Sequence, residues 1–167
     1  MQYQFTIQEA IFTLSNFNKQ IEQLNRRFYS NFFGPIKVDG KPIPHADKAQ
    51  SNEDELIKYK KLITDTSALR HSIAQANNEL IVDNQSVTYQ LEWVRQTRFL
   101  ITQLENLIQR QETRVETGVG IVEYSAYNEL SIREDIDRLT KEVNKISSLI
   151  DQSNAQSIIT IELSTEI

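Results

Sequence analysis

The side chains most able to do chemistry in this sequence are arginines that stand beside aromatic residues. Arg95 and Arg98 occupy consecutive turns of an expected helix, close to Trp93 and Phe99. Guanidinium groups form paired hydrogen bonds with phosphates and stack on aromatic rings. The group therefore fits a phosphorylated small molecule that contains a base.

Polar residues of the preceding helix join this candidate site, because antiparallel neighbours would bring the end of that helix beside the start of the next. The predicted ligand-binding residues are Arg70, Asn77, Asn78, Trp93, Arg95, Arg98 and Arg114. A competing interpretation is that the arginines form surface ion pairs with Glu92, Glu105 and Glu112 at helical spacing. Both interpretations stay open at the level of the sequence.

Patterns typical of catalysis are missing from the sequence. It contains no Gly-x-Ser-x-Gly elbow, no Walker loop and no dinucleotide-binding glycine motif. The two histidines, His45 and His71, fall in different elements, and there is no cysteine. We therefore predict no catalytic residues, no metal ligands, no cofactor and a protein that is not an enzyme.

Charge and hydropathy exclude further classes of protein. The net charge of −5 disfavours binding to a nucleic acid polymer, which needs a basic surface. No apolar run approaches the roughly 18–20 residues of a membrane span, and the N-terminal residues lack the features of a signal peptide. These observations predict no membrane partner and a cytoplasmic location, in a bacterial cell or in the cytosol of a phage-infected host.

The elements that must position these residues are mostly helical. Only 4 glycines and 3 prolines interrupt the chain. Apolar periodicity predicts helices over residues 7–30, 51–80, 86–112 and 131–153. The predicted N-terminal caps of the second, third and fourth helices are Ser51, Ser86 and Ser131. β-branched residues predict a hairpin within 114–124 and a strand within 157–163, which could pair with each other. We expect a mainly α fold, an antiparallel bundle of about four long helices with this small β element, as one domain over residues 1–167.

Two of these helices carry more apolar surface than one neighbour covers. The third has two adjacent apolar stripes, so we expect it at the centre of the bundle. On the fourth, a heptad seam predicts a coiled coil and favours self-association. The residues of that seam are Ile132, Ile136, Leu139, Val143, Ile146 and Ile150.

Short runs spread along the chain form a recognisable series: Glu9-Ala10, the run 19–27, the end of helix two at Asn77-Asn78, Ser86-Val-Thr88, the run 137–142 and the run 149–154. In these runs the chain resembles the septicolysin-like family of uncharacterised bacterial and phage proteins. Ala155 stands where the family pattern has a tryptophan. The resemblance implies a helical fold and oligomerisation, and it carries no established activity.

The sequence therefore predicts a homo-oligomeric, non-enzymatic binding protein. Its ligand would be a small nucleotide-like signalling molecule, held in pockets between helices or subunits and sequestered there, as phage anti-defence sponges do. The alternative is a structural or protein-interaction module that docks a partner helix through the heptad seam.

Overall fold

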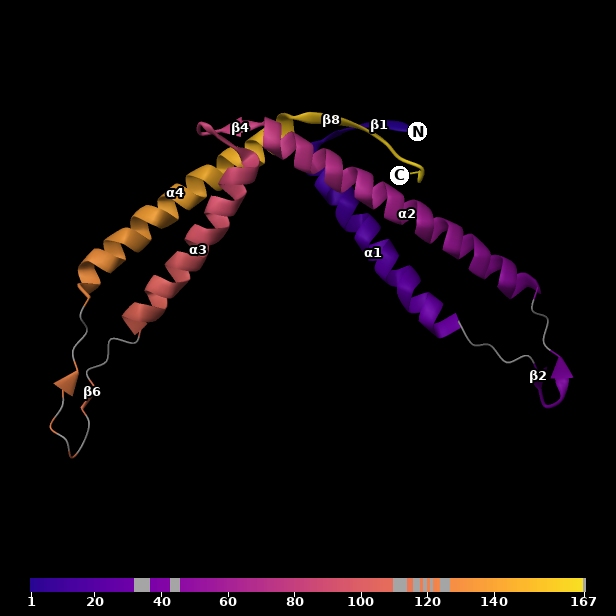
Figure 1. Ribbon diagram of the computed structural model, residues 1–167, viewed down its shortest axis with the longest axis horizontal. Helices are drawn as coiled ribbons and strands as arrows, with labels where there is room; N and C mark the ends of the chain where they lie inside the picture. Colours follow the sequence, from indigo (N-terminus) through magenta and orange to yellow (C-terminus); the bar gives the residue numbers. More distant parts are fainter. Residues whose placement is uncertain are drawn as a thin grey trace. The chain divides into compact units, whose positions relative to one another are not determined.

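The computed structural model describes residues 1–31, 37–42, 46–109, 114–115, 118, 120, 122–123 and 127–166. Its long elements are the helices α1 (Ile7–Asn31), α2 (Ala46–Glu79), α3 (Val87–Gln109) and α4 (Glu129–Gln156) (Figure 1). The strands are β1 (Gln2–Thr6), β2 (Lys37–Val38), β3 (Lys41–Pro42), β4 (Ile81–Val82), β5 (Gln85–Ser86), β6 (Arg114–Val115), β7 (Val122–Glu123) and β8 (Ile158–Glu162). The predicted mainly α fold with four long helices is confirmed.

The chain divides into two compact units. The first unit comprises Met1–Ala76 and Asn154–Ile167, and the second unit comprises Asn77–Ser153. In the first unit α1 lies antiparallel to α2, as the contacts of Arg70 with Asn18 and of Arg27 with Glu55 indicate. In the second unit α3 lies antiparallel to α4. The prediction of a single domain over residues 1–167 stays a prediction.

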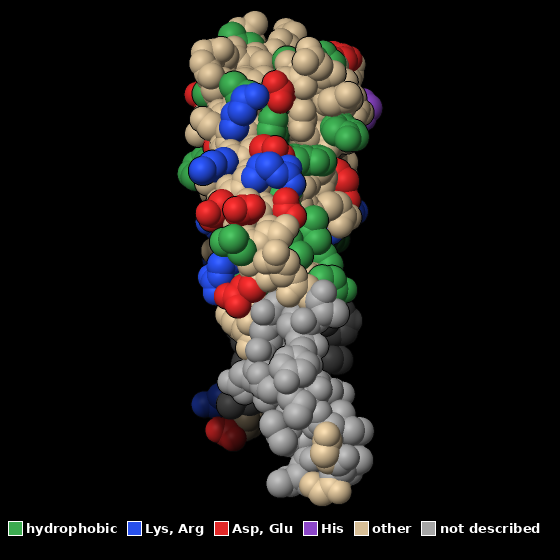
Figure 2. Space-filling model, turned by 90° about the vertical axis from the view of Figure 1, so that its left-hand side faces the viewer, with side chains coloured by type: hydrophobic (Ala, Val, Ile, Leu, Met, Phe, Trp, Pro, Cys, Tyr) green, Lys and Arg blue, Asp and Glu red, His purple; other side chains and the backbone are tan. Residues whose placement is uncertain are grey.

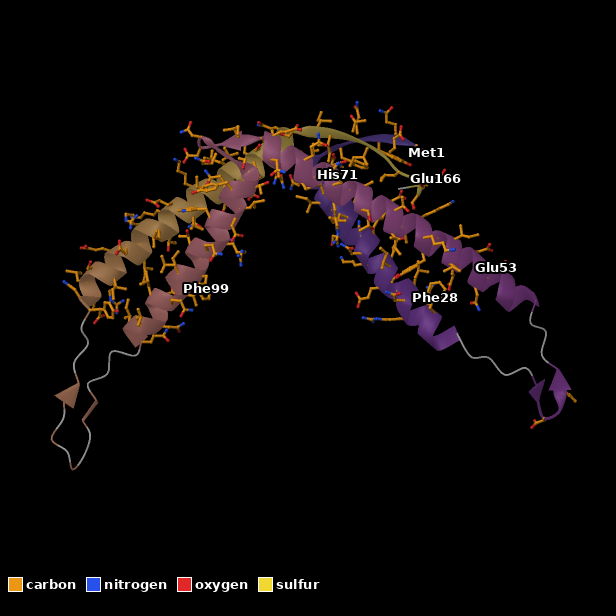
Figure 3. The ribbon with its side chains drawn as sticks, in the orientation of Figure 1. Met1, Phe28, Glu53, His71, Phe99 and Glu166 are labelled. Carbon is orange, nitrogen blue, oxygen red and sulfur yellow. The ribbon has the colours of Figure 1, made fainter. Side chains whose placement is uncertain are left out.

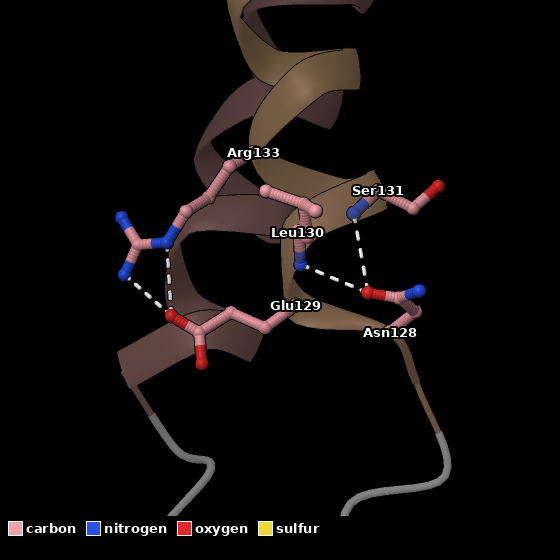
Figure 4. A network of polar contacts seen from close by, with 5 residues as sticks. All are labelled: Asn128, Glu129, Leu130, Ser131 and Arg133. Carbon is pink, nitrogen blue, oxygen red and sulfur yellow. Dashed lines mark hydrogen bonds and ion pairs between the residues drawn. The ribbon is translucent and has the colours of Figure 1, made fainter.

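Polar side chains cap three of the helices at their N-termini. Thr6 and Glu9 form a capping box at α1, in which the Glu9 carboxylate accepts the Thr6 backbone N–H at 2.8 Å. The predicted cap of α3 is confirmed, because the Ser86 hydroxyl accepts the Tyr89 N–H at 3.2 Å. At α4 the cap is Asn128, whose side-chain oxygen accepts the N–H groups of Leu130 and Ser131 (Figure 4).

Two predicted helix starts were therefore wrong. Ser131 lies inside α4, since Asn128 caps the chain one turn earlier and a Glu129–Arg133 ion pair supports the first turn (Figure 4). Ser51 lies inside α2, which begins at Ala46. The sequence before Ser51 contains good helix formers, so a capping pattern there does not start a helix.

The predicted pairing of the terminal strand was also wrong. β8 pairs antiparallel with β1, with Thr6 opposite Ile158 and Gln2 opposite Glu162. The segment within 114–124 instead closes on itself, with Arg114 opposite Glu123. A local hairpin closes a short loop and loses less chain entropy than pairing with a distant strand. β1 itself was missed, although its alternation of polar and aromatic residues is a strand signal.

Two short hairpins turn through residues with positive φ. Asp39 and Gly40 join β2 to β3, and Asp83 and Asn84 join β4 to β5, with φ of 49° at Asp83 and 66° at Asn84. Positive φ at both central positions is the geometry of a two-residue type I′ turn. Asp, Asn and Gly are the residues that tolerate this geometry, and the second turn sets the position of the Asp83 side chain.

The heptad seam of α4 packs inside the chain. The core of the second unit consists of Val82, Val87, Val94, Val143, Ile146 and Ile150. Val143, Ile146 and Ile150 of the seam belong to this core, and Ile136 and Leu139 are half-buried. On α3, Leu100 is 47% exposed and Leu107 is 39% exposed, so this helix carries apolar surface that no neighbour among the described residues covers.

Candidate functional site

A cavity of about 310 Å³ opens in the second unit, where α3, α4 and the β4–β5 turn meet. The residues around it are Asp83, Tyr89, Gln90, Trp93, Glu142, Lys145 and Ile146. Its walls thus combine two aromatic rings with two carboxylates and one amine. A volume of this size holds a single ring system of a small ligand.

The sequence of α3 places the aromatic rings at the cavity. Val87 and Val94 face the core, and Trp93 packs half-buried against the edge of that core. Tyr89 stands one turn earlier on the same side of the helix and is 54% exposed. Gln90 is buried between them and donates from its amide nitrogen to the Val82 carbonyl at 3.0 Å. This bond ties α3 to the strand that leads into the turn.

The charged groups of the cavity are only loosely paired. The Lys145 ammonium lies 3.4 Å from the Asp83 carboxylate, and its side chain is 63% exposed. The Glu142 carboxylate lies 3.4 Å from Arg138, which makes a shorter contact of 2.9 Å with Asp135. Contacts as long as 3.4 Å are weak hydrogen bonds. Lys145 and Glu142 can therefore exchange these partners for ligand atoms at little cost.

Of the predicted arginines, Arg95 is held in an ion pair. Its guanidinium donates to both carboxylate oxygens of Glu92, at 2.7 and 2.8 Å. The Arg95 hydrogen bonds, with a smaller contribution from Gln96, lower the pKa of Glu92 to about 2. Glu92 is thus ionised at any physiological pH. The competing interpretation of a surface ion pair is confirmed for Arg95.

The other predicted arginines with described side chains each contact a polar residue of their own unit. Arg98 lies in the second unit and donates to the Ser147 hydroxyl at 3.0 Å. Arg70 lies in the first unit and donates to the side-chain oxygen of Asn18 at 3.3 Å. Arg114 belongs to β6, and its side chain lies outside the described residues. His45 also lies outside them.

The two predicted asparagines lie at the end of α2 and have different environments. The Asn78 side-chain oxygen accepts the Thr88 hydroxyl at 2.7 Å, which links α2 to the first turn of α3. The Asn77 side-chain oxygen is buried, and no residue that the structure describes donates to it. A buried acceptor without a donor lowers the stability of the fold, so packing alone does not explain an asparagine at position 77.

Sequence reasoning found Trp93 but missed the rest of the cavity. Tyr89 and Gln90 precede Trp93 by four and three positions, a spacing that places all three on one side of a helix. Glu142 and Lys145 flank the heptad seam at Val143 and are three positions apart. A search for charged residues next to the buried seam would have found both.

Charges elsewhere are mixed. On the face that Figure 2 shows, basic and acidic side chains are interspersed. Within the described ranges, no group of three or more His, Cys, Asp or Glu residues is placed to hold a metal ion. Nor does any helix, over the residues described, have the length and apolarity to cross a membrane.

Comparison with protein-family models, with curated proteins and with solved structures finds no match for this chain. The resemblance to the septicolysin-like family therefore stays a prediction.

Proposed function

We propose that this chain is a non-enzymatic protein that binds a small nucleotide-like ligand in the cavity of the second unit. The observation that carries the proposal is the lining of that cavity, where Trp93 and Tyr89 stand beside Lys145 and two carboxylates. Aromatic rings stack on bases, ammonium groups bind phosphates, and carboxylates accept hydrogen bonds from amino groups. All three kinds of contact suit a nucleotide.

The role we assign to this binding is sequestration. The ligand would be a signalling nucleotide, withdrawn from solution in the cytosol of a bacterium or of a phage-infected host. A cavity near the lower end of the ligand-pocket range encloses the base and leaves the phosphates at the mouth, beside Lys145. The arginines that sequence analysis favoured are secondary, because Arg95 is occupied by Glu92.

Trp93 offers a direct test, because it is the chain's only tryptophan. Titration of the purified protein with nucleotides should quench its fluorescence as a base stacks on the ring. A Tyr89→Ala variant should weaken binding by about tenfold, in line with the 1–3 kcal/mol of a base–aromatic stack. Phe99 is exposed on the same helix (Figure 3), so the matched control comes from the first unit: Phe12→Ala, at an aromatic residue of α1 that is 67% exposed. A flat titration with every nucleotide would overturn the proposal.

We infer in addition that the chain self-associates through α3. Leu100, Leu107 and Phe99 are all exposed on this helix, whereas its opposite stripe is buried against α4. Apolar side chains in such a row favour contact with another apolar surface. A second copy of the chain supplies an identical row, which suits a two-fold symmetric contact. This surface replaces the α4 seam as the site of association.

A further inference from the structure

The two units repeat one pattern of residues and hydrogen bonds. At the start of α1, the hydroxyl of Thr6 accepts the Glu9 N–H at 3.2 Å, and at the start of α3 the hydroxyl of Ser86 accepts the Tyr89 N–H at 3.2 Å. The next residues, Ile7 and Val87, are both fully buried. Further along, Ile-x-Gln-Leu occurs at 21–24 in α1 and at 101–104 in α3, with the same offset.

The backbone contacts of these helices repeat as well. The Ile7 N–H donates to the Ser157 carbonyl at 3.0 Å, and the Val87 N–H donates to the Leu80 carbonyl at 2.9 Å. In the strands that precede them, Thr6 lies opposite Ile158 in the same way as Ser86 lies opposite Ile81. Each long pair of helices thus begins at an equivalent two-stranded element.

The returning helices α2 and α4 match at a constant offset. Apolar residues that are buried or, at Leu139, half-buried correspond, and so do two asparagines whose side-chain oxygens are buried without a donor among the described residues. The corresponding pairs are Leu62 with Leu139, Leu69 with Ile146, Ile73 with Ile150 and Asn77 with Asn154. The same offset makes Asp65 of α2 the counterpart of Glu142 of α4.

Asp65 shows what a carboxylate at this position does in the first unit. It is 1% exposed, and its two oxygens accept the backbone N–H groups of Ser164 and Thr165, each at 2.8 Å. One carboxylate thus holds two adjacent N–H donors of the chain's own tail. In the second unit no tail follows β4, because the chain turns back at Asp83, and Glu142 faces the open cavity.

We infer that Glu142 holds two adjacent N–H donors of a ligand as Asp65 holds those of the tail, and that the ligand is a guanine nucleotide. This inference rests on the proposed nucleotide-binding function. The guanine edge carries a ring N–H next to an exocyclic amine, which match the two oxygens of a carboxylate. Adenine presents one amine beside a ring nitrogen that only accepts.

Lys145 and the aromatic rings complete the nucleotide site. Lys145 lies three positions after Glu142, so the two side chains share one face of α4, and both line the cavity. Trp93 and Tyr89 supply rings for stacking on the base, and the Lys145 ammonium remains for the phosphate. Glu142 alone therefore distinguishes guanine from adenine.

Titrations that follow Trp93 fluorescence of the full chain with GMP, IMP and AMP test this inference. GMP should bind about tenfold more tightly than IMP, which lacks the exocyclic amine and so one hydrogen bond to a charged group. AMP should bind more weakly still. Glu142→Gln should remove most of the preference for GMP, while Glu134→Gln, outside the cavity on the same helix, should leave it unchanged.

The outcomes separate the two claims. Binding of AMP as tight as that of GMP, or a preference for GMP that survives in Glu142→Gln, overturns the guanine inference and leaves the proposed function standing. Absence of binding by all three nucleotides and by cyclic guanine and adenine nucleotides overturns both. Thermal unfolding of Glu142→Gln gives the control on folding, and an unchanged midpoint is expected for this exposed residue.

Discussion

Arg95 and Lys145 show how the immediate partner of a cation decides whether it is free to bind a ligand. Arg95 makes two short bonds to the Glu92 carboxylate, at 2.7 and 2.8 Å. Lys145 lies 3.4 Å from its nearest partner, Asp83. A phosphate must break both hydrogen bonds between Arg95 and Glu92 to bind Arg95, whereas it displaces only a weak contact with Asp83 to bind Lys145. The loosely paired lysine is therefore the better phosphate contact.

The Glu92–Arg95 pair predicts a particular titration. A carboxyl pKa lowered to about 2 means that the pair contributes fully above the ordinary carboxyl pKa of 4.5 and is lost as the pH falls through about 2. NMR titration of the Glu92 carboxyl carbon should show its midpoint near pH 2. In Arg95→Ala the midpoint should return toward 4.5. A midpoint near 4.5 in the unsubstituted chain would show that the ion pair does not persist in solution.

Asp65 predicts a loss of stability when it is removed. Asp65→Ala leaves the N–H groups of Ser164 and Thr165 without their acceptor in a part-buried position, so unfolding should require about 2–4 kcal/mol less free energy. Chemical denaturation measures this difference. Asp137→Ala, an exposed position on α4, is the control and should change stability by less than about 0.5 kcal/mol. Equal effects of the two substitutions would contradict the role of Asp65.

The helices α3 and α4 depend on each other because the heptad seam is shared between them. Ile146→Ala should therefore lower the stability of the chain by about 2–4 kcal/mol, since Ile146 is 5% exposed and its deletion leaves a cavity. Leu91→Ala, at an exposed position of α3 outside the row of Leu100 and Leu107, should cost less than about 1 kcal/mol. Denaturation with urea at several protein concentrations measures both. If Ile146→Ala lowered only the oligomer mass, the seam would belong to an intermolecular contact.

Local patterns in the sequence predicted the helices, whereas the partners of the strands could not be predicted. Helical periodicity and the turns at Asp39-Gly40 and Asp83-Asn84 are properties of short segments. The pairing of β8 with β1 joins segments that are far apart in the sequence, and the residues of neither strand specify which strand it pairs with. The cavity was missed for the same reason, because Glu142 and Trp93 come from separate helices.

At the scale of the whole molecule, one pattern serves two purposes. In the first unit a carboxylate fastens the tail, and in the second unit its counterpart faces a cavity. The repeat was hard to see in the sequence because packing preserves apolar character and spacing more strictly than identity. Its clearest traces are Ile-x-Gln-Leu in α1 and α3 and Gln-x-Asn at the ends of α2 and α4.

Self-association is the prediction that belongs to the whole molecule. Leu100→Glu places a charge in the exposed apolar row of α3, so it should dissociate the oligomer, because burial of an unpaired carboxylate in a contact is unfavourable. Sedimentation velocity should show a lower mass, with unchanged helicity by circular dichroism. Ser148→Glu, exposed on α4, is the matched control and should leave the mass unaltered. A monomeric unsubstituted chain, or a Leu100→Glu variant of unchanged mass, would remove α3 as an interface. Tyr89, which lines the cavity, belongs to the same helix as this interface. If Leu100→Glu dissociated the oligomer and also weakened nucleotide binding, the cavity would lie next to a second copy of the chain.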